Sequence, residues 1–376
     1  MQSYLKTVEH VYLNGKLYPD RTGVGRIRIF GGSETYDLSL GFPVVTTRKL
    51  YLKSMVKELL GFIKGSNSVS DLGESFWGAW SPCIEDVEEE IERIKTEATA
   101  SGASENIKMF NDPRHIESIR KYLSSKIGTI GPMYGVMWRK FPRINSYVPE
   151  WFKSFDDFPS DRKEEIQTEF MKQVLLSQGQ LENNQKNWEN FAVSEYFKTY
   201  DQLNMVYLNL KRKPFSSHHR VTALHPDTSG DESLTPKQNV MAGQAALNAC
   251  HSFFQFMVTE EIKNQETKKV LNCMFYMSSS DVMLGRPYNI AQYALLTMLM
   301  SHCLDYVPGK LTIVSCDTHI YKNHMGAAEE QLTRDPMPLC QVKFPEDKKD
   351  LFGFSIEDIE FVNYTSHSSL PLKPAV

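Results

Sequence analysis

The stretch Leu247–Phe256, LNACHSFFQF, places a cysteine and a histidine at the head of an apolar run. Its texture predicts a strand over residues 250–258, in which successive side chains point to opposite faces of a sheet. Cys250 and Phe254 would then share one face, and His251 would lie on the other and could not act as the base of the Cys250 thiol. Two roles stay open for Cys250, a nucleophile or a small buried apolar residue, because most buried cysteines are inert.

Helical and strand patterns alternate loosely on both sides of this stretch, without a glycine-rich dinucleotide motif or a phosphate loop. Apolar spacing predicts an amphipathic N-terminal helix, which Gly15 can end, and glycines punctuate an alternating segment further on. The expected elements are this helix, paired strands within residues 21–40, a helix over 51–64, strands over 250–258, 270–277 and 310–316, and a helix over 289–305.

Bulk composition excludes several classes of protein. A chain of 376 residues with 41% hydrophobic residues suits one large domain or two ordinary ones. Its net charge of −4 gives no sign of a nucleic-acid footprint. The six cysteines form no CxxC pair, so neither a zinc framework nor a disulfide scaffold is expected, and a reducing cytoplasm is the natural location. No signal peptide is expected, and the longest apolar stretch, near residues 293–304, is too short to span a membrane.

Two polar blocks interrupt the apolar texture, at about residues 84–126 and 143–205. Both are rich in charged and amide side chains and carry helical rather than disordered patterns. We interpret them as surface insertions.

Two polar residues each admit a structural and a functional interpretation, and one polar cluster raises the question of a metal. Glu58 flanks the apolar stripe of the 51–64 helix, as a solvated side chain or as a half-buried carboxylate with a raised pKa that relays protons. Asn289 is either the N-cap of the helix that it opens or an amide that recognises an N–H beside a C=O, as on a uracil edge. Asp317, His319 and His324 could bind a metal, but their spacing matches no standard site.

Six motifs together carry more information than any single residue. They are DRTGVGRIRIFG (20–31), GFPVVTTRKLYLKSMVKELLGFIKG (41–65), GPMYGVMWRKF (131–141), ACHSFFQF (249–256), SDVMLGRPYNIAQYALL (280–296) and DTHIYKNH (317–324). In the residues of these motifs and in their order along the chain, the sequence resembles the thymidylate synthase family, including its pyrimidine hydroxymethylase branch. The resemblance covers about residues 1–80, 128–141 and 245–376, and the two polar blocks have no counterpart in a compact member.

The resemblance implies a single α+β domain over residues 1–376, built on a bent mixed β-sheet with flanking helices. It also implies an obligate homodimer with sheets stacked back to back. Because arginines would be lent across that interface, dimerisation would be a catalytic requirement.

The resemblance also assigns catalytic roles. Cys250 would add to C6 of the pyrimidine, Glu58 would order water and relay protons near O4, and Tyr134 would help to remove the C5 proton. Asn289 would read O4 and N3. An asparagine there favours uracil over cytosine, since its amide can donate to O4 and accept from N3–H.

Further side chains are implied to bind the two substrates. Aromatic packing is the structural alternative for the tryptophans among them. The expected nucleotide ligands are Arg21, Ser279, His319 and Tyr321, and the expected folate ligands are Trp77, Trp80, Asp281, Gly285 and the C-terminal Val376.

The main departures from the family pattern lie at positions that the resemblance assigns to binding of the nucleotide phosphate. Ser278 stands where the family has an arginine, and Arg286 stands where it has an apolar residue. We therefore expect Arg286 and Arg220, with His218 or His219, to rebuild the phosphate clamp, since the guanidinium fork matches phosphate. Two smaller departures are Arg48 in place of a lysine and Gly61 in place of a common tryptophan.

The expected activity is folate-dependent one-carbon transfer to C5 of dUMP. We favour a dUMP hydroxymethylase, in which water attacks an exocyclic methylene, over a thymidylate synthase, in which tetrahydrofolate delivers a hydride. A catalytically inactive nucleotide-binding relative is the third alternative. The expected co-substrate is 5,10-methylenetetrahydrofolate, with no metal, no nucleic acid and no membrane partner, and such an enzyme fits a virus that builds hydroxymethyluracil DNA.

Overall fold

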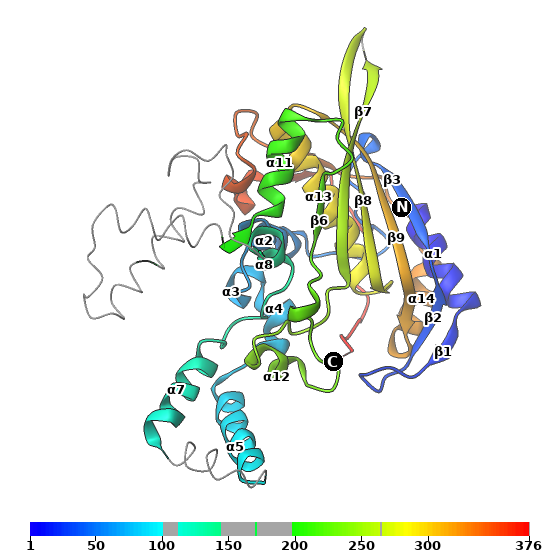
Figure 1. Cartoon of the computed structure of the whole chain (residues 1–376). Coiled ribbons are helices and arrows are strands. Elements are labelled where there is room, and N and C mark those ends of the chain that lie inside the picture. The colour runs from blue at the N-terminus through cyan, green and yellow to red at the C-terminus, as the bar shows by residue number, and fades with distance from the viewer. Residues whose placement is uncertain (101–111, 144–169, 171–197, 264, 376) are drawn as a thin grey trace.

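The computed structural model describes residues 1–100, 112–143, 170, 198–263 and 265–375 (Figure 1). Its centre is a seven-stranded sheet in the order β1-β2-β9-β8-β7-β6, with β3 also paired to β9. The β8–β9 pair is parallel and the other pairs of this sheet are antiparallel. The expected α+β fold with a mixed sheet and flanking helices is thereby confirmed. The strands are β1 Lys16–Tyr18, β2 Arg26–Phe30, β3 Ser33–Asp37, β6 Arg220–Thr222, β7 His251–Lys263, β8 Glu266–Asp281 and β9 Val307–Tyr321.

Strands β7, β8 and β9 are longer than the apolar runs that predict them. Their central side chains alternate, and Phe254, Phe256 and Phe275 are wholly buried on the face that the helices cover. The β7–β8 hairpin continues beyond this core, where Ile262 is 80% exposed (Figure 1). The spacing of apolar residues therefore predicts the part of each strand that packs on the core. The outer part of the hairpin is held by backbone hydrogen bonds between the strands and leaves no such pattern.

The sheet is bent where β2 and β3 meet on β9. The expected pairing of the two strands with each other is wrong, because they lie end to end along β9, separated by Gly31 and Gly32. Both glycines have positive φ, at 80° and 154°, which L side chains rarely adopt. Across the bend Ser315 Oγ lies 2.7 Å from Thr318 Oγ1, whereas an unbroken strand would point these side chains to opposite faces.

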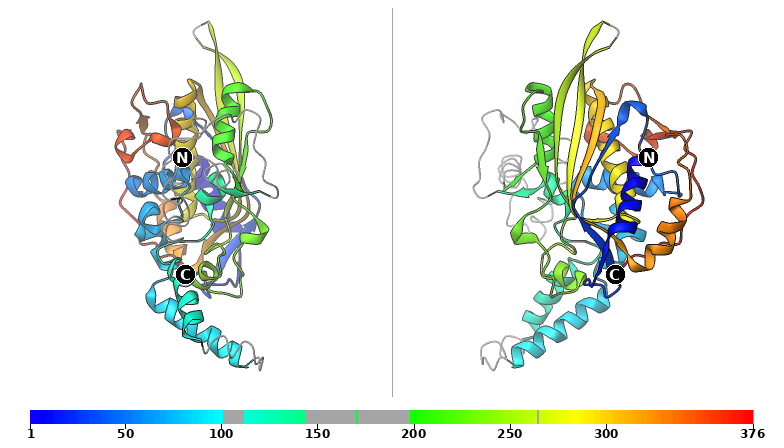
Figure 2. Two further views of the ribbon diagram at one scale, coloured as in Figure 1. Left: turned by 60° about the vertical axis from the view of Figure 1, so that its left-hand side comes forward. Right: turned by 90° about the vertical axis from the view of Figure 1, so that its right-hand side faces the viewer.

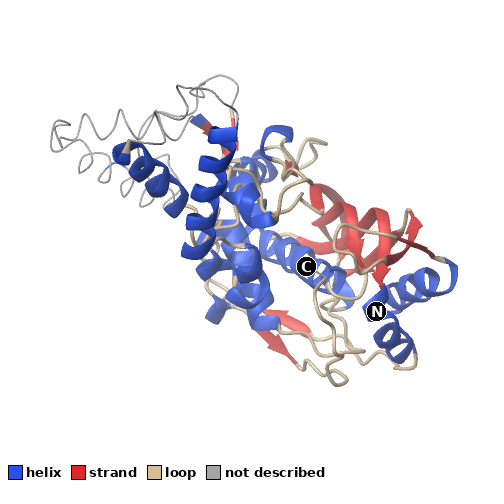
Figure 3. Ribbon diagram, turned by 90° about the horizontal axis from the view of Figure 1, so that it is seen from below, coloured by secondary structure: helices blue, strands red, loops and turns tan. Residues whose placement is uncertain are grey.

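Two groups of helices cover the sheet. The larger group lies on one face, and the smaller group lies beside β2 and β9 (Figures 1 and 2). Seen from below, most helices gather on one side of the strands (Figure 3). The larger group comprises α2 Leu52–Lys64, α3 Val69–Leu72, α4 Glu74–Trp77, α8 Tyr134–Arg139, α11 Gln202–Arg212 and α13 Gly285–Leu304; the smaller comprises α1 Gln2–Asn14 and α14 Met325–Leu332.

Helix α13 is the central element of the core. It is apolar on every side, and nearly all of its residues are buried between the sheet and α2. A helix that is hydrophobic all round belongs in the interior of a protein. It begins at Gly285, one turn before the expected start at residue 289.

The first polar block forms a helical hairpin that projects from the body (Figure 1). Its helices are α5 Ile84–Ala100 and α7 Pro113–Ser124, which follows Asp112 as its N-cap. The hairpin has a small apolar cluster of its own, which includes Met241 from helix α12 Pro236–Met241. This apolar cluster is separate from the main core of the described residues.

Most of the second block lies outside the described residues, but its end is described. Leu203 is wholly buried in the main core, and Asp201 pairs with the buried Arg139. The core therefore resumes by Asp201, earlier than the expected boundary at residue 205. Two short antiparallel pairs complete the fold, β4 Phe141–Pro142 with β5 Thr199–Tyr200 and β10 Gln341–Lys343 with β11 Glu360–Val362.

No helix in the described part of the chain has the length and apolar character needed to cross a membrane.

Candidate active site

Cys250 lies directly before β7 and is only partly buried. Its backbone N–H donates to the hydroxyl of Tyr134, at 3.1 Å, which fixes the first turn of α8 against the strand. Burial and, to a lesser extent, the Asp281 carboxylate raise the pKa of the Cys250 thiol to about 11, although the Arg26 guanidinium acts in the opposite direction. The free thiol is therefore protonated at neutral pH, and a bound ligand or a proton acceptor has to activate it.

His251 does not lie where strict alternation predicts. The register of β7 on β8 shifts between His251 and Phe253, and this bulge turns His251 into the core. Both His251 and Phe254 contact the ring of Tyr293, with ring centroids 5.5 and 5.3 Å away, so the expected opposite faces are wrong.

His251 is nevertheless unsuited to act as the base of Cys250, because of its contacts and its lowered pKa. Its ring stacks on Tyr134 at 3.8 Å and 4°, and its Nδ1 lies 3.0 Å from the hydroxyl of Tyr293. Burial lowers the pKa of His251 to about 3, so the ring is neutral and a poor proton acceptor. We assign it a packing role behind Tyr134.

Glu58 is buried in α2, so the interpretation as a solvated flank is wrong. Trp77 Nε1 donates to its Oε1 and Gln292 Nε2 to its Oε2, both at 2.5 Å. Burial raises the pKa of Glu58 to about 7, although the two hydrogen bonds act in the opposite direction. A carboxyl group that titrates near neutral pH can both accept and donate a proton under working conditions.

A continuous set of contacts joins Glu58 to Cys250. The ring of Trp77 lies 6.2 Å from that of Tyr134, which receives the Cys250 N–H, and 5.4 Å from that of Trp80. Trp77 thus positions Glu58 by its indole N–H as well as forming an aromatic wall. Packing accounts for part of the role of both tryptophans, as the structural alternative allowed.

Gln292 was missed by the sequence analysis. It is a buried amide in the mostly apolar helix α13 and lies three residues after Asn289, on the same helical face. A polar residue inside an apolar helix is the signal that could have identified it, since buried polar groups require partners.

Asn289 lies inside α13, whose N-cap is Leu284, so the N-cap interpretation is wrong. Within the described residues its amide has no hydrogen-bond partner. Gly285 lies one turn earlier in the helix. A side chain there would place its Cβ 3.7 Å from Asn289 Oδ1, and because glycine has none, this side of the amide is uncovered. The amide is therefore free to bind a ligand.

Asp281 ends β8 and shapes the turn into α13. Its Oδ1 accepts the backbone N–H groups of Met283 and Leu284, at 3.0 and 3.1 Å. Across the parallel pair it lies opposite His319. Because its charge acts on the Cys250 thiol, Asp281 belongs to the same site.

The end of β9 contributes a polar row. Asp317, His319 and Tyr321 alternate along the strand, and Asp317 lies opposite Ser279 of β8. His319 Nδ1 is 3.4 Å from Asp317 Oδ1, and the His319 and Tyr321 rings meet edge to face at 5.1 Å. The sequence analysis named His319, Tyr321 and Ser279, and the structure brings all three to this row.

Of the three residues considered for a metal, Asp317 and His319 are neighbours, but His324 has other partners. His324 Nε2 lies 2.7 Å from the carbonyl of Lys373, and its Nδ1 faces Asp281 at 4.0 Å. Asp317 instead faces two arginines of β2. The three side chains thus do not converge on one point.

Arg286 does not fit its expected role at the phosphate. Its side chain is wholly buried; Nη1 donates to Ser280 Oγ and Ser315 Oγ, and Nη2 lies 2.9 Å from Glu34 Oε1. The guanidinium joins α13 to the sheet and is closed to a ligand. We withdraw the expectation that it holds the phosphate.

The other members of the expected clamp are dispersed. His219 is buried, with Nε2 about 3 Å from the carbonyls of Lys213 and Pro214. Arg220 is exposed on β6, with Nη2 3.2 Å from His218 Nδ1. His218 and Arg220 are thus both exposed to solvent, whereas His219 is not.

The remaining expected positions are accounted for as follows. Arg21 is exposed in the loop before β2, and Arg48 is buried with Nη2 donating to the carbonyl of Met283. A Cβ at Gly61 would lie 2.6 Å from Leu72 of α3, so the packing of α3 explains why no larger residue stands there. Val376 lies outside the described residues.

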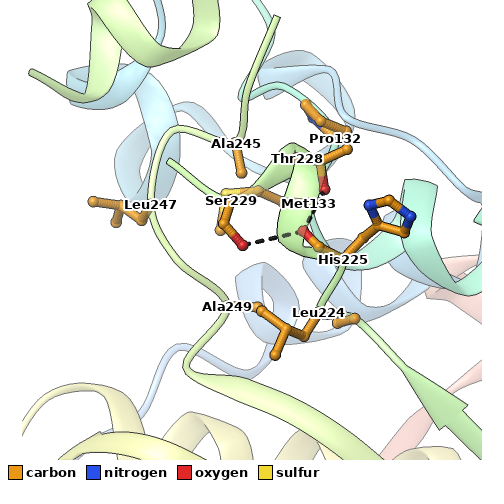
Figure 4. Close-up of a pocket in the computed structure, with 10 residues that line it drawn as sticks. Pro132, Met133, Leu224, His225, Thr228, Ser229, Ala245, Leu247 and Ala249 are labelled. Carbon is orange, nitrogen blue, oxygen red and sulfur yellow. Dashed lines mark hydrogen bonds between the residues drawn. The ribbon is translucent and has the colours of Figure 1, made fainter. Parts of the chain in front are cut away.

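A shallow hollow adjoins this site (Figure 4). Met133, next to Tyr134, and Ala249, next to Cys250, both line it. The backbone carbonyl of His225 accepts hydrogen bonds from Thr228 and Ser229, which hold the opposite wall. Most of the side chains that line the hollow are apolar.

Comparison with known families matches residues 2–376 to one family model, described as thymidylate synthase.

Proposed function

The chain belongs to the thymidylate synthase family, whose members are one-carbon transferases that act with folate on C5 of dUMP, and we propose that it is a dUMP hydroxymethylase. The overall reaction would convert dUMP, methylenetetrahydrofolate and water into hydroxymethyl-dUMP and tetrahydrofolate.

Cys250 would add through sulfur to C6 of the uracil, which makes C5 a carbon nucleophile. C5 would attack the one-carbon unit carried by the folate, and loss of the C5 proton and of tetrahydrofolate would leave an exocyclic methylene. Water would then add to that methylene, and release of the cysteine would restore the ring. The hydroxyl of Tyr134, beside the Cys250 backbone, supports a role in the C5 proton transfer.

The observation that supports a step with water as the nucleophile is the environment of Glu58, a residue that either candidate enzyme of this family would use. Its pKa of about 7 makes it an effective base for a water molecule at neutral pH, since a general base works best near the operating pH. Trp77 and Gln292 each occupy one of its oxygens, so its orientation is fixed.

The free amide of Asn289 supports uracil as the base. It can donate to O4 and accept from N3–H, which cytosine does not offer. His319 and Tyr321 would bind the sugar, and Asp281, Trp80 and Gly285 would contact the folate.

A thymidylate synthase is the second candidate. Trp77 and Trp80 form an apolar wall beside Tyr134, and such a wall could exclude water and favour hydride transfer. An inactive relative is the third candidate, and the presence of Cys250, Glu58, Tyr134 and Asn289 speaks against it.

We also propose a homodimer formed through the sheet. Its outer face carries exposed apolar side chains that the described helices leave uncovered. On β2, β7 and β8 they are Phe30 at 92%, Met257 at 55%, Met274 at 52% and Tyr276 at 37% exposure. Exposed large apolar side chains on several strands of one sheet favour an interaction site.

Release of tritium from dUMP labelled at C5 tests the proposal. We expect release that depends on methylenetetrahydrofolate, without the absorbance increase that dihydrofolate would give. Release with that increase would establish a synthase instead. No release, with a Cys250→Ser variant as the background control, would establish an inactive relative.

A further inference from the structure

The proposed substrate carries a phosphate, and the inference that follows rests on the proposed function. The charged groups that act on the Cys250 thiol include two carboxylates, Asp281 and Asp317, which both raise its pKa. The neighbouring Ser278 has no charge and donates to the carbonyls of Ala249 and Cys250. A phosphate dianion in this acidic setting needs cations close by.

Most buried arginines near the site are committed elsewhere. Arg286 pairs with Glu34, Arg48 bonds the turn before α13, and Arg139 pairs with Asp201. Their guanidinium groups hold elements of the fold together. These three guanidinium groups are closed to a phosphate, and the less buried arginines of the same chain include Arg21 in the loop before β2 and Arg26 and Arg28 on β2 itself.

Strand β2 brings two arginines to the polar row of β9. Arg26 lies directly opposite Tyr321, and Arg28 directly opposite His319. The two arginines are two residues apart and therefore lie on one face of β2. Ile27 and Ile29 lie on the opposite face and pack on the core. The charge of Arg26 lowers the pKa values of both Cys250 and Tyr321, which places it at the candidate site.

Asp317 holds the two guanidinium groups side by side. Arg26 Nη2 lies 3.1 Å from Asp317 Oδ2, and Arg28 Nε lies 3.1 Å from Asp317 Oδ1. Two cations on one carboxylate leave a net positive charge. Their side chains are still 21% and 38% exposed, and each guanidinium has five N–H donors, so most donors remain available.

We propose that Arg26 and Arg28, fixed by Asp317, bind the phosphate of the nucleotide from within the same chain. A pre-oriented guanidinium pair matches phosphate oxygens in geometry and charge. The ring of Tyr18, over which the Arg28 guanidinium lies at 5.6 Å, adds to this orientation. The pair supplies in β2 the cations that the expected clamp of Arg286 and Arg220 does not.

The test compares dUMP with deoxyuridine, which lacks only the phosphate. Titration calorimetry on the full chain would give both dissociation constants for the wild type, Arg26→Gln, Arg28→Gln and a Lys16→Gln control. Lys16 lies opposite Arg28 on β1, so its loss removes a nearby charge but no guanidinium on Asp317.

Each arginine variant should weaken dUMP binding about 10- to 100-fold, the usual effect of losing charge-assisted hydrogen bonds. Deoxyuridine binding should stay within about 3-fold, and Lys16→Gln should leave both within the same range. Inorganic phosphate should compete with dUMP in the wild type and lose this effect in the variants.

Equal weakening of dUMP and deoxyuridine would show a merely structural ion pair and overturn the proposal. Unchanged dUMP binding in both arginine variants would do the same. A wild type that binds the two ligands equally would also overturn it, whereas tritium release from the same sample would still uphold the proposed function. Either arginine variant suffices if the other fails to fold.

Discussion

Glu58 exerts opposing effects on stability and on catalysis. Its pKa in the folded protein, about 7, lies above the ordinary value of 4.5, so the folded state holds its proton to a higher pH. Burial of the Glu58 carboxyl group therefore leaves the free energy of unfolding unchanged below about pH 4.5. Above about pH 7, where the folded protein holds the buried carboxylate, it lowers the free energy of unfolding by its maximum. A shift of this size corresponds to about 3 kcal/mol.

Glu58→Gln should therefore stabilise the protein at about pH 8, by up to about 3 kcal/mol, and have little effect at about pH 4.5. It should also lower kcat by at least about 100-fold, because the proton relay is lost. Urea unfolding at both pH values and steady-state kinetics measure the two effects. Equal stabilisation at both pH values would contradict the burial of an ionisable Glu58.

Gln292 should set the pH at which Glu58 works. Its hydrogen bond lowers the pKa of Glu58, so Gln292→Leu should raise that pKa and move the acidic limb of the kcat/KM profile to higher pH. Ser301→Ala is a matched control, since Ser301 is a buried polar residue of the same helix, nine residues from Gln292, or about 13 Å along the axis. An unshifted limb in Gln292→Leu would remove Gln292 from the relay.

The thiol of Cys250 should react slowly in the free enzyme. Its alkylation rate should rise with an apparent pKa of about 11, and Arg26→Gln should raise that pKa because it removes the favourable charge. Mass spectrometry of the Cys250 peptide separates this thiol from the other partly exposed cysteines. An apparent pKa near the ordinary 9.0 would mean that burial is not decisive.

Some site residues were predictable from sequence and others were not. Cys250, Glu58 and Tyr134 stand in motifs, and the structure brings them into one set of contacts. Gln292, Arg26 and Arg28 were missed because each acts through a partner far away in the sequence. Arg286 was predicted to bind phosphate because an arginine in a polar motif suits such a role. Its pairing with the buried Glu34 is visible only in the structure.

At the scale of elements, the buried Arg139–Asp201 pair connects α8 to the start of α11. Arg139 Nε lies 2.8 Å from Asp201 Oδ1, and both side chains are almost wholly inaccessible. Asp201→Asn should destabilise the chain by about 3–5 kcal/mol, because removal of one buried partner leaves the other charge uncompensated.

The matched control for this prediction is Glu88→Gln. Glu88 pairs with Arg120 between the two hairpin helices, where both side chains are well exposed. Its loss should cost less than about 1 kcal/mol in the same denaturant titration. Similar costs for the two variants would contradict the burial of the Arg139 pair.

Element types followed from the sequence better than their pairing did. The helices over 51–64 and 289–305 and the three long strands are present, because their apolar spacing reports burial directly. The β7 bulge and the end-to-end arrangement of β2 and β3 were not predictable, since alternation says which side chains are buried but not which strands pair.

At the scale of the whole molecule, the uncovered face of the sheet predicts self-association. Met274→Glu should convert the proposed homodimer into a monomer, because it places a charge in the middle of the apolar face. Analytical ultracentrifugation of wild type and variant measures this. The exposed Lys53→Glu on helix α2, which lies on the face of the sheet that the helices cover, serves as a charge-change control. A wild type that sediments as a monomer would contradict the proposed dimer.

The most direct test of the proposed hydroxymethylase follows the origin of one oxygen atom. The wild-type enzyme would turn over dUMP and methylenetetrahydrofolate in water labelled with heavy oxygen, and mass spectrometry would identify the nucleotide product. We predict hydroxymethyl-dUMP that carries the heavy oxygen on its new carbon, with folate remaining as tetrahydrofolate. Unlabelled dTMP together with dihydrofolate would contradict this account and establish a thymidylate synthase.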